Sequence, residues 1–376
     1  MSLPKQRKGE SFGFHLFSVD SYEGTLGDPE KIIWSSIKHM ISLDVASRVL
    51  CFYHNITNQR LRKKVAANMK LYIQHAFEFY EAAHDAKANT APLFYYYSFL
   101  NLAKALCEIR YPKFHTKPES YRHGLSWRPN TKYLVNMEVE SVSVSTRGVW
   151  HALWEAIEGE RCTVANPAKL SVRELFGLCF GTSIEFTRAY NRLISLVDLV
   201  DPDILIDEPE TQIWLRFSVN RYELRQLRIS RHKLLNLITY KTSNYKQVQS
   251  SDKDLWTFEL EHTKQIPRKY KEPLFNIVQP EIQKLNLFTR LDFEELTYAI
   301  PIQTRLPITL SQLMVLYTLT FWLGSLVRYD PHSLSELQDS EYWLLIDGFM
   351  NQCRIWLLEL FEWQFYKAET TLRLVR

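Results

Sequence analysis

Glycine is scarce in this sequence, with 11 residues in 376, which leaves little material for glycine-rich phosphate-binding loops. No Walker A loop, GxGxxG, HExxH, GxSxG or protein-kinase pattern is present. Because these patterns follow from the geometry that their chemistry needs, their absence argues against the enzyme classes that use them.

Cysteine is also sparse, and its five residues do not follow a metal-binding or disulfide pattern. None of them forms a CxxC pair, and no two of the 11 histidines are four residues apart. An odd number of cysteines without such spacing predicts reduced thiols in a cytoplasmic protein. We therefore expect no disulfide, no metal site and no cofactor.

Long apolar runs are missing as well. The longest, from Leu313 to Val327, has 15 residues, whereas a membrane-spanning helix needs about 20. The first 14 residues (MSLPKQRKGESFGF) lack the apolar segment of a signal peptide. We expect a buried core helix at 313–327 and no membrane association.

Aromatic residues, in contrast, make up 14% of the chain, and such a surplus suits protein–protein interfaces. The formal net charge is only +4, from 46 basic and 42 acidic residues, a weaker bias than a dedicated nucleic-acid binder has. One local cluster between residues 216 and 233 is strongly basic. Its candidate nucleic-acid contacts are Arg221, Arg225, Arg228, Arg231 and Lys233. The alternative for this cluster is a solvated surface.

Helical periodicity dominates the first and last parts of the chain. Asp28-Pro29-Glu30 predicts a helix start, because Asp caps free N–H groups and Pro is tolerated in the first turn. Predicted helices cover 28–41, 60–87, 92–109, 150–157, 184–199, 312–327 and 341–366, and a further one starts at a capping box at Ser171. Predicted strands cover 137–144, 214–219, 255–260 and 296–302, with a linker between Pro202 and Pro209 and a loop at 240–253.

The predicted fold class is therefore α+β and predominantly α-helical. We expect N- and C-terminal helical blocks with a smaller strand-containing insert between them. The expected regions are 1–135 (helical), 136–305 (mixed) and 306–376 (helical, packing back on the first).

One pair of residues has the spacing of a ribonuclease motif. Arg110 and His115 are separated by four residues, as in HEPN-type ribonucleases, where an Arg steadies the phosphate and a His moves the 2′-hydroxyl proton. Comparable Arg–His spacings occur three times in the chain, close to the number expected by chance. Pro112 also disfavours a continuous helix through the pair. A structural or ligand-contact role is the alternative.

A second group of polar residues lies on and after the predicted helix 92–109. Asn101 and Lys104 belong to a helix that is apolar nearly all round, where polar groups must find partners or line a cavity. His123 and Gly124 follow shortly afterwards. These residues could form a basic, aromatic pocket for a phosphate or nucleotide. The alternative is an internal hydrogen-bond network.

The same residues resemble the YaaC-like protein family of bacteria. The matching segments are PLFYYY at 92–97, NLAKAL at 101–106, HGLS at 123–126, GSLVRYDP at 324–331 and, more loosely, EFYEAA at 78–83. The resemblance implies a bacterial, cytoplasmic protein without a bound metal, and it carries no catalytic residue over. It also implies that Lys104, His123, Gly124, Arg328 and Tyr329 belong to one shared feature.

The expected function is that of a bacterial accessory protein. We expect it to act through protein partners encoded nearby or as a homo-oligomer, with a phage- or mobile-element defence complex as the setting that the family suggests. Two alternatives stay open. One is a HEPN-like ribonuclease using Arg110 and His115, and the other is a nucleotide- or nucleic-acid-binding module using Lys104, His123 and Arg328.

Overall fold

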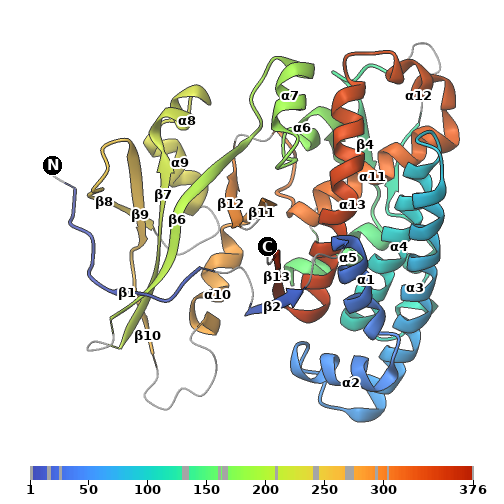
Figure 1. The fold of residues 1–376 in the computed structure, drawn as a ribbon, viewed down its shortest axis with the longest axis horizontal. Coiled ribbons are helices and arrows are strands. Elements are labelled where there is room, and N and C mark those ends of the chain that lie inside the picture. The colour runs from blue at the N-terminus through green and yellow to red at the C-terminus, as the bar shows by residue number, and fades with distance from the viewer. Residues whose placement is uncertain are drawn as a thin grey trace. The chain divides into compact units, whose positions relative to one another are not determined.

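The computed structural model describes residues 3–14, 18–24, 28–128, 135–159, 162, 168–207, 211–239, 245–266, 275–292, 295–302 and 305–374. The chain forms two compact units (Figure 1). Unit 1 comprises Met1–Ser21 and Ser195–Thr304, and unit 2 comprises Tyr22–Ile194 and Arg305–Arg376. The fold is α+β and mostly helical, as the composition and periodicity predict.

Unit 1 is built on an antiparallel sheet with strand order β11-β12-β6-β7-β9-β8, on which β1 pairs with β6 and β10 with β7. Its strands are β1 (Glu10–Ser11), β6 (Leu196–Asp207), β7 (Gln212–Asn220), β8 (Tyr245–Val248), β9 (Leu255–Leu260), β10 (Lys264–Gln265), β11 (Phe288–Asp292) and β12 (Glu295–Pro301). Its helices are α8 (Arg221–Gln226), α9 (Arg231–Thr239) and α10 (Phe275–Lys284). Leu205 opposes Trp214 across the central β6–β7 pair, and both belong to the buried core of this unit.

Unit 2 is helical apart from short strands. Its helices are α1 (Pro29–His39), α2 (Leu43–Phe52), α3 (Gln59–Asp85), α4 (Ala91–Arg110), α5 (Val149–Glu158), α6 (Val172–Phe176), α7 (Ser183–Tyr190), α11 (Gln312–Tyr329), α12 (Pro331–Gln338) and α13 (Trp343–Tyr366), with 3₁₀ turns η1 (Phe114–Thr116) and η2 (Pro118–Tyr121). A small sheet joins β3 (Leu125–Ser126), β4 (Ser141–Val144) and β5 (Ala168–Ser171), and β13 (Ala368–Leu374) follows α13. Strand β2 (Ser18–Gly24) includes the boundary between the two units, because unit 1 extends to Ser21 and unit 2 resumes at Tyr22.

Helix α4 lies at the centre of unit 2 and contacts α3, α5, α11 and α13 (Figure 1). Both α4 and α11 are buried almost all round, as expected for helices whose apolar residues are not confined to one face. Residues 136–194 also lie in this unit. The division into regions 1–135, 136–305 and 306–376 differs from these two units and stays a prediction.

Most predicted elements are confirmed. The Asp28 carboxylate accepts a hydrogen bond from the Glu30 N–H and caps α1, and the Ser171 hydroxyl accepts one from Glu174 at the start of α6. The long helices at 60–87, 92–109, 312–327 and 341–366 correspond to α3, α4, α11 and α13. The strands at 214–219, 255–260 and 296–302 correspond to β7, β9 and β12.

The predicted helix at 184–199 is wrong in its second half. Asn191 adopts a left-handed backbone (φ 49°) that ends α7, and β6 begins at Leu196. The linker predicted between Pro202 and Pro209 is also wrong in its first part, because β6 continues through Pro202 to Asp207. The register of β6 against β7 shifts between Val200 and Asp203, so this proline lies at a bulge, where a strand tolerates the missing N–H. Pro209 lies outside the described residues.

Two further elements are shorter or more regular than expected. In the predicted strand 137–144, only Ser141–Val144 is extended, because Asn136 forms a turn by accepting the N–H of Glu138 on its side chain. The predicted loop 240–253 contains β8, whose Tyr245 and Val248 are buried. Residues 240–244 of that loop lie outside the described residues.

Glycine is required where the segment after η2 meets α5. Gly148, the N-cap of α5, has φ 141°, and a Cβ there would lie 2.3 Å from the Gly124 nitrogen. Gly159, the C-cap of the same helix, has φ 74°, and among the described residues no heavy atom outside its chain neighbours and its own helix lies within 4 Å of such a Cβ. A substitution at Gly159 therefore tests the cost of a positive φ alone, whereas a substitution at Gly148 adds a clash with the main chain of Gly124.

We expect Gly148→Ala to lower the free energy of unfolding by about 3 kcal/mol, because it adds a main-chain clash to a disfavoured φ. Gly159→Ala, the matched control, should cost only about 1 kcal/mol. Denaturant unfolding followed by circular dichroism measures both. Equal losses for the two variants would contradict the contact.

Candidate functional site

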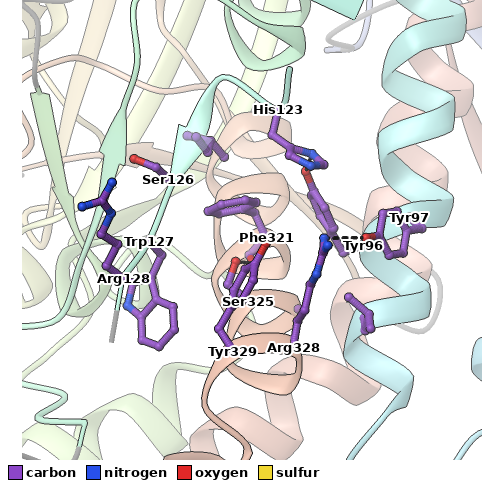
Figure 2. A pocket seen from close by; sticks show the side chains of 13 residues that line it. Tyr96, Tyr97, His123, Ser126, Trp127, Arg128, Phe321, Ser325, Arg328 and Tyr329 are labelled. Atoms are coloured by element: carbon purple, nitrogen blue, oxygen red, sulfur yellow. Dashed lines mark hydrogen bonds between the residues drawn. The ribbon is translucent and has the colours of Figure 1, made fainter. Parts of the chain in front are cut away.

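A cavity of about 480 Å³ lies in unit 2 between α4, α11 and the segment 123–128 (Figure 2). We call it the His123 pocket. It is lined by Leu93, Tyr96, Tyr97, His123, Leu125, Ser126, Trp127, Arg128, Phe321, Gly324, Ser325, Arg328 and Tyr329. Its volume lies in the range of small-molecule binding sites.

The wall of the pocket depends on close packing of α11 on α4. Gly324 faces Tyr96, and a Cβ at Gly324 would lie 3.1 Å from the Tyr96 Cβ, so a larger residue would push the helices apart. The Tyr96 ring packs edge-on against Phe321, with centroids 5.4 Å apart, and also contacts Tyr317. The tyrosine is therefore held against α11 by contacts with three of its residues.

The backbone around His123 is held by the start of α5. The N–H groups of Val149 and Trp150, which have no partner within their own helix, donate to the carbonyls of Arg122 (2.8 Å) and His123 (3.0 Å). Gly124 completes this contact with φ 81°. In this way the first turn of α5 sets the direction in which the imidazole points.

The His123 imidazole is hydrogen-bonded to Tyr96. Its Nδ1 lies 2.5 Å from the Tyr96 hydroxyl (Figure 2). Burial lowers the pKa of His123, and the positive charges of Lys104 and Arg328 lower it further. Burial likewise raises the pKa of Tyr96 well above 10. Both groups are therefore neutral at pH 7, and the imidazole can serve as a donor or an acceptor in the pocket.

Two arginines supply positive charge to the pocket. Arg328, in the last turn of α11, donates from Nη1 to the Tyr97 hydroxyl at 3.1 Å, and its guanidinium lies 5.1 Å from the Tyr329 ring centroid (Figure 2). Arg128 lines the pocket from the segment after β3. Neither arginine forms an ion pair with a carboxylate of the described residues. Their charge therefore remains available to an anion.

Most other polar atoms of the lining are already bonded within the protein. The Trp127 indole N–H donates to the Glu140 carboxylate at 2.7 Å, and Trp127 is 7% exposed. The Ser325 hydroxyl donates to the Phe321 carbonyl one helical turn earlier. These groups are thus largely satisfied, and the aromatic faces and guanidinium groups remain for a ligand.

The structure brings together part of the set predicted from the sequence. His123 and Arg328 line the same pocket, and Gly124 lies next to it in the chain. Asn101 donates its amide to the Tyr97 carbonyl of its own helix and does not line the pocket. Lys104 is half-buried with Nζ 5.8 Å from the Tyr72 ring centroid, and it affects His123 through its charge.

The lining residues Trp127 and Arg128 were not among the sequence candidates. They follow the HGLS segment directly, so their proximity in sequence to His123 was the available signal. Tyr96 and Tyr97 occur in the matching segments but were not assigned to the pocket, whereas the resemblance grouped Tyr329 with His123 and Arg328.

Arg110 and His115 have separate partners. Arg110 is exposed at the end of α4 with Nη2 3.5 Å from the Gly159 carbonyl. The His115 ring lies beside the fully buried Glu108, whose Oε1 is 2.7 Å from Nδ1 and also accepts the His115 N–H. Glu108 further accepts the N–H of Lys113, so it organises the turn after α4. The helix ends at Arg110, before Pro112, as expected.

The basic cluster lies in unit 1, on α8, α9 and the turn between them. Its exposed members are Arg225, Arg228, Arg231 and Lys233. Arg221 is half-buried, donates to the Lys253 carbonyl and lies 6.0 Å from the Trp256 ring centroid. Nucleic-acid contact by these residues stays a prediction.

Within the described part of the chain, no three His, Cys, Asp or Glu side chains are grouped in a way that could hold a metal ion. No helix in that part is both long enough and apolar enough to cross a membrane.

Together these features define a mostly helical α+β protein with an aromatic pocket that carries two arginines. A family comparison matches residues 46–364 to the YaaC-like Protein model, which covers α4, the His123 pocket and α11. The chain therefore belongs to the YaaC-like protein family, as its sequence segments indicate. Comparison with curated proteins finds no match.

We expect Lys104→Met to raise the pKa of His123, because it removes one of the two positive charges that disfavour imidazolium. The pKa should stay below 6.5, since burial is the larger cause. Histidine-selective NMR titration measures this value. The exposed Lys87, in the turn between α3 and α4, provides the control Lys87→Met, which should leave the titration unchanged. An unchanged pKa in Lys104→Met would place Lys104 too far away to act on the pocket.

Proposed function

We propose that the protein binds a small anionic ligand with an aromatic ring, of the nucleotide class, in the His123 pocket. The observation that carries this proposal is the pair Arg128 and Arg328, which lines a largely aromatic and apolar cavity without carboxylate partners in the described residues. An anion would complete the hydrogen bonds of the guanidinium groups, which are suited to planar recognition of phosphate or carboxylate.

The aromatic lining favours a ring in the ligand. Tyr329 is 56% exposed beside the Arg328 guanidinium, and Trp127 forms part of the same lining. A planar base can contact these rings while its anionic group lies near the arginines. The neutral His123 then provides a polar contact that fixes orientation without adding a full charge.

Binding accounts for these residues better than catalysis does. His123 has one hydrogen bond to Tyr96, and the described residues that line the pocket include no carboxylate to act as a second general acid or base. The ribonuclease alternative would need Arg110 and His115 to act together, and they have different partners. It stays a prediction, as do the accessory role through protein partners, the defence setting and the cytoplasmic location.

The test uses a fluorescent N-methylanthraniloyl derivative of AMP, with unlabelled AMP, GMP, ribose and inorganic phosphate as competitors. We expect saturable binding, with the nucleotides competing better than ribose or phosphate alone. Arg328→Ala should weaken the affinity roughly 10- to 100-fold, because a hydrogen bond to a charged group contributes about 1.5–3 kcal/mol. The affinity of Arg328→Lys should lie between those of the unchanged protein and Arg328→Ala, since lysine keeps the charge but lacks the planar guanidinium.

Arg192→Ala is the matched control, because this arginine is exposed in the same unit and does not line the pocket. It should bind like the unchanged protein. An unaltered affinity in Arg328→Ala, or no saturable binding of the probe to the unchanged protein, would overturn the proposal.

A further inference from the structure

A second cavity of about 380 Å³ lies elsewhere in unit 2, lined by residues of α3, α4, α5 and the end of α13. Its apolar lining residues include Leu106 and Ile109 of α4 and Ala156 and Ile157 of α5. Lys367 and Arg110 line it as well, and its described lining includes no carboxylate. The His123 pocket shares none of these residues.

Lys367 reaches this cavity because of the backbone at the end of α13. It is the C-cap of the helix, and its left-handed conformation (φ 50°) turns the chain out of the helical path. Its ammonium donates to the Gln364 side-chain oxygen at 2.8 Å. That amide lines the cavity too, so the hydrogen bond holds Nζ at the cavity wall.

The surroundings increase the fraction of uncharged amine at Lys367 above that of an exposed lysine. Burial lowers its pKa from 10.5 to about 8, although a helix C-terminus by itself would favour the cation. The Nε2–H of the neighbouring His54 donates to the Phe365 carbonyl, 2.7 Å away. Burial lowers the pKa of His54 to about 4, so at neutral pH it adds no positive charge. A desolvated lysine amine of this kind is a nucleophile.

We propose that this cavity binds a small carbonyl compound carrying a carboxylate, and that Lys367 forms a reversible imine with it while Arg110 contacts the carboxylate. Arg110 has its guanidinium 3.5 Å from the Gly159 carbonyl, a long contact that leaves other N–H groups for a ligand. Its exposed position places the carboxylate near solvent and the carbonyl toward the apolar wall.

The chemistry balances without a further reactant. The amine lone pair forms the C–N bond as the carbonyl π bond opens, and the oxygen takes one proton from the nitrogen to give a carbinolamine. The hydroxyl group then leaves with the second nitrogen proton as water, and the C=N bond forms. Hydrolysis runs the same steps backwards, so no oxidant or reductant is consumed.

Glyoxylate is the probe, with cyanoborohydride to reduce the imine to a stable secondary amine. After treatment of the full chain at pH 7.4, peptide mass mapping should place the label on Lys367 at least about tenfold above the exposed Lys113, because more of its amine is neutral. Labelling of Lys367 should reach half its maximum near pH 8. A distribution of the label among the lysines that follows only their exposure to solvent would overturn the proposal. This test uses the unchanged protein and needs no variant.

Two variants separate the roles of the cations. Arg110→Gln should reduce glyoxylate labelling of Lys367 several-fold and leave labelling by the uncharged acetaldehyde unchanged. Equal effects on the two aldehydes would overturn the carboxylate contact. Lys367→Arg keeps a cation at the C-cap and should remove the label at this position, with circular dichroism to check the fold. Nucleotide binding at the His123 pocket should be unaffected in both variants, so the two proposals can fail independently.

Discussion

The contact between Tyr96 and its neighbours on α11 and after η2 is the interaction on which the site depends. Gly324 allows α11 to approach α4 closely, and this approach places Tyr96 against Phe321. The hydroxyl of the same tyrosine meets His123, whose backbone is held by the first turn of α5. One side chain therefore links three segments that are far apart in the sequence, and the pocket lies where they meet.

Electrostatics gives this packing a functional consequence. A half-buried, neutral His123 lies among positive charges from Lys104 and Arg328, while the rest of the lining is mainly aromatic and apolar. Such an arrangement disfavours an additional cation and favours an anion, since the anion would relieve the repulsion between the positive groups. The physical account of the fold and the proposed ligand class thus depend on the same few contacts.

Local chemistry made much of the fold predictable. The cap at Asp28 and the apolar residues of α3 and α4 indicate helices without tertiary information, and the chain confirms them. The second half of the helix predicted at 184–199 was wrong, because a short apolar run fits either period and strand pairing with β7 decides between them. Pro202 indicated a linker, whereas a bulge accommodates it within β6.

The site was only partly predictable for a related reason. A helix that is apolar nearly all round indicated that Asn101 and Lys104 needed partners or lined a cavity, and the family segments grouped His123 with Arg328. Which polar side chains face the cavity depends on helix rotation and on the close approach at Gly324, which periodicity does not reveal. Asn101 therefore bonds within α4, while Tyr97, one turn earlier, lines the pocket.

A crystal structure of the full chain with a bound nucleoside monophosphate tests the central claim most directly. The account predicts that the phosphate lies within hydrogen-bond distance of the Arg128 or Arg328 guanidinium and that the base contacts Trp127 or Tyr329. Density for the nucleotide at another site, or a His123 pocket that holds only water at saturating nucleotide, would contradict it.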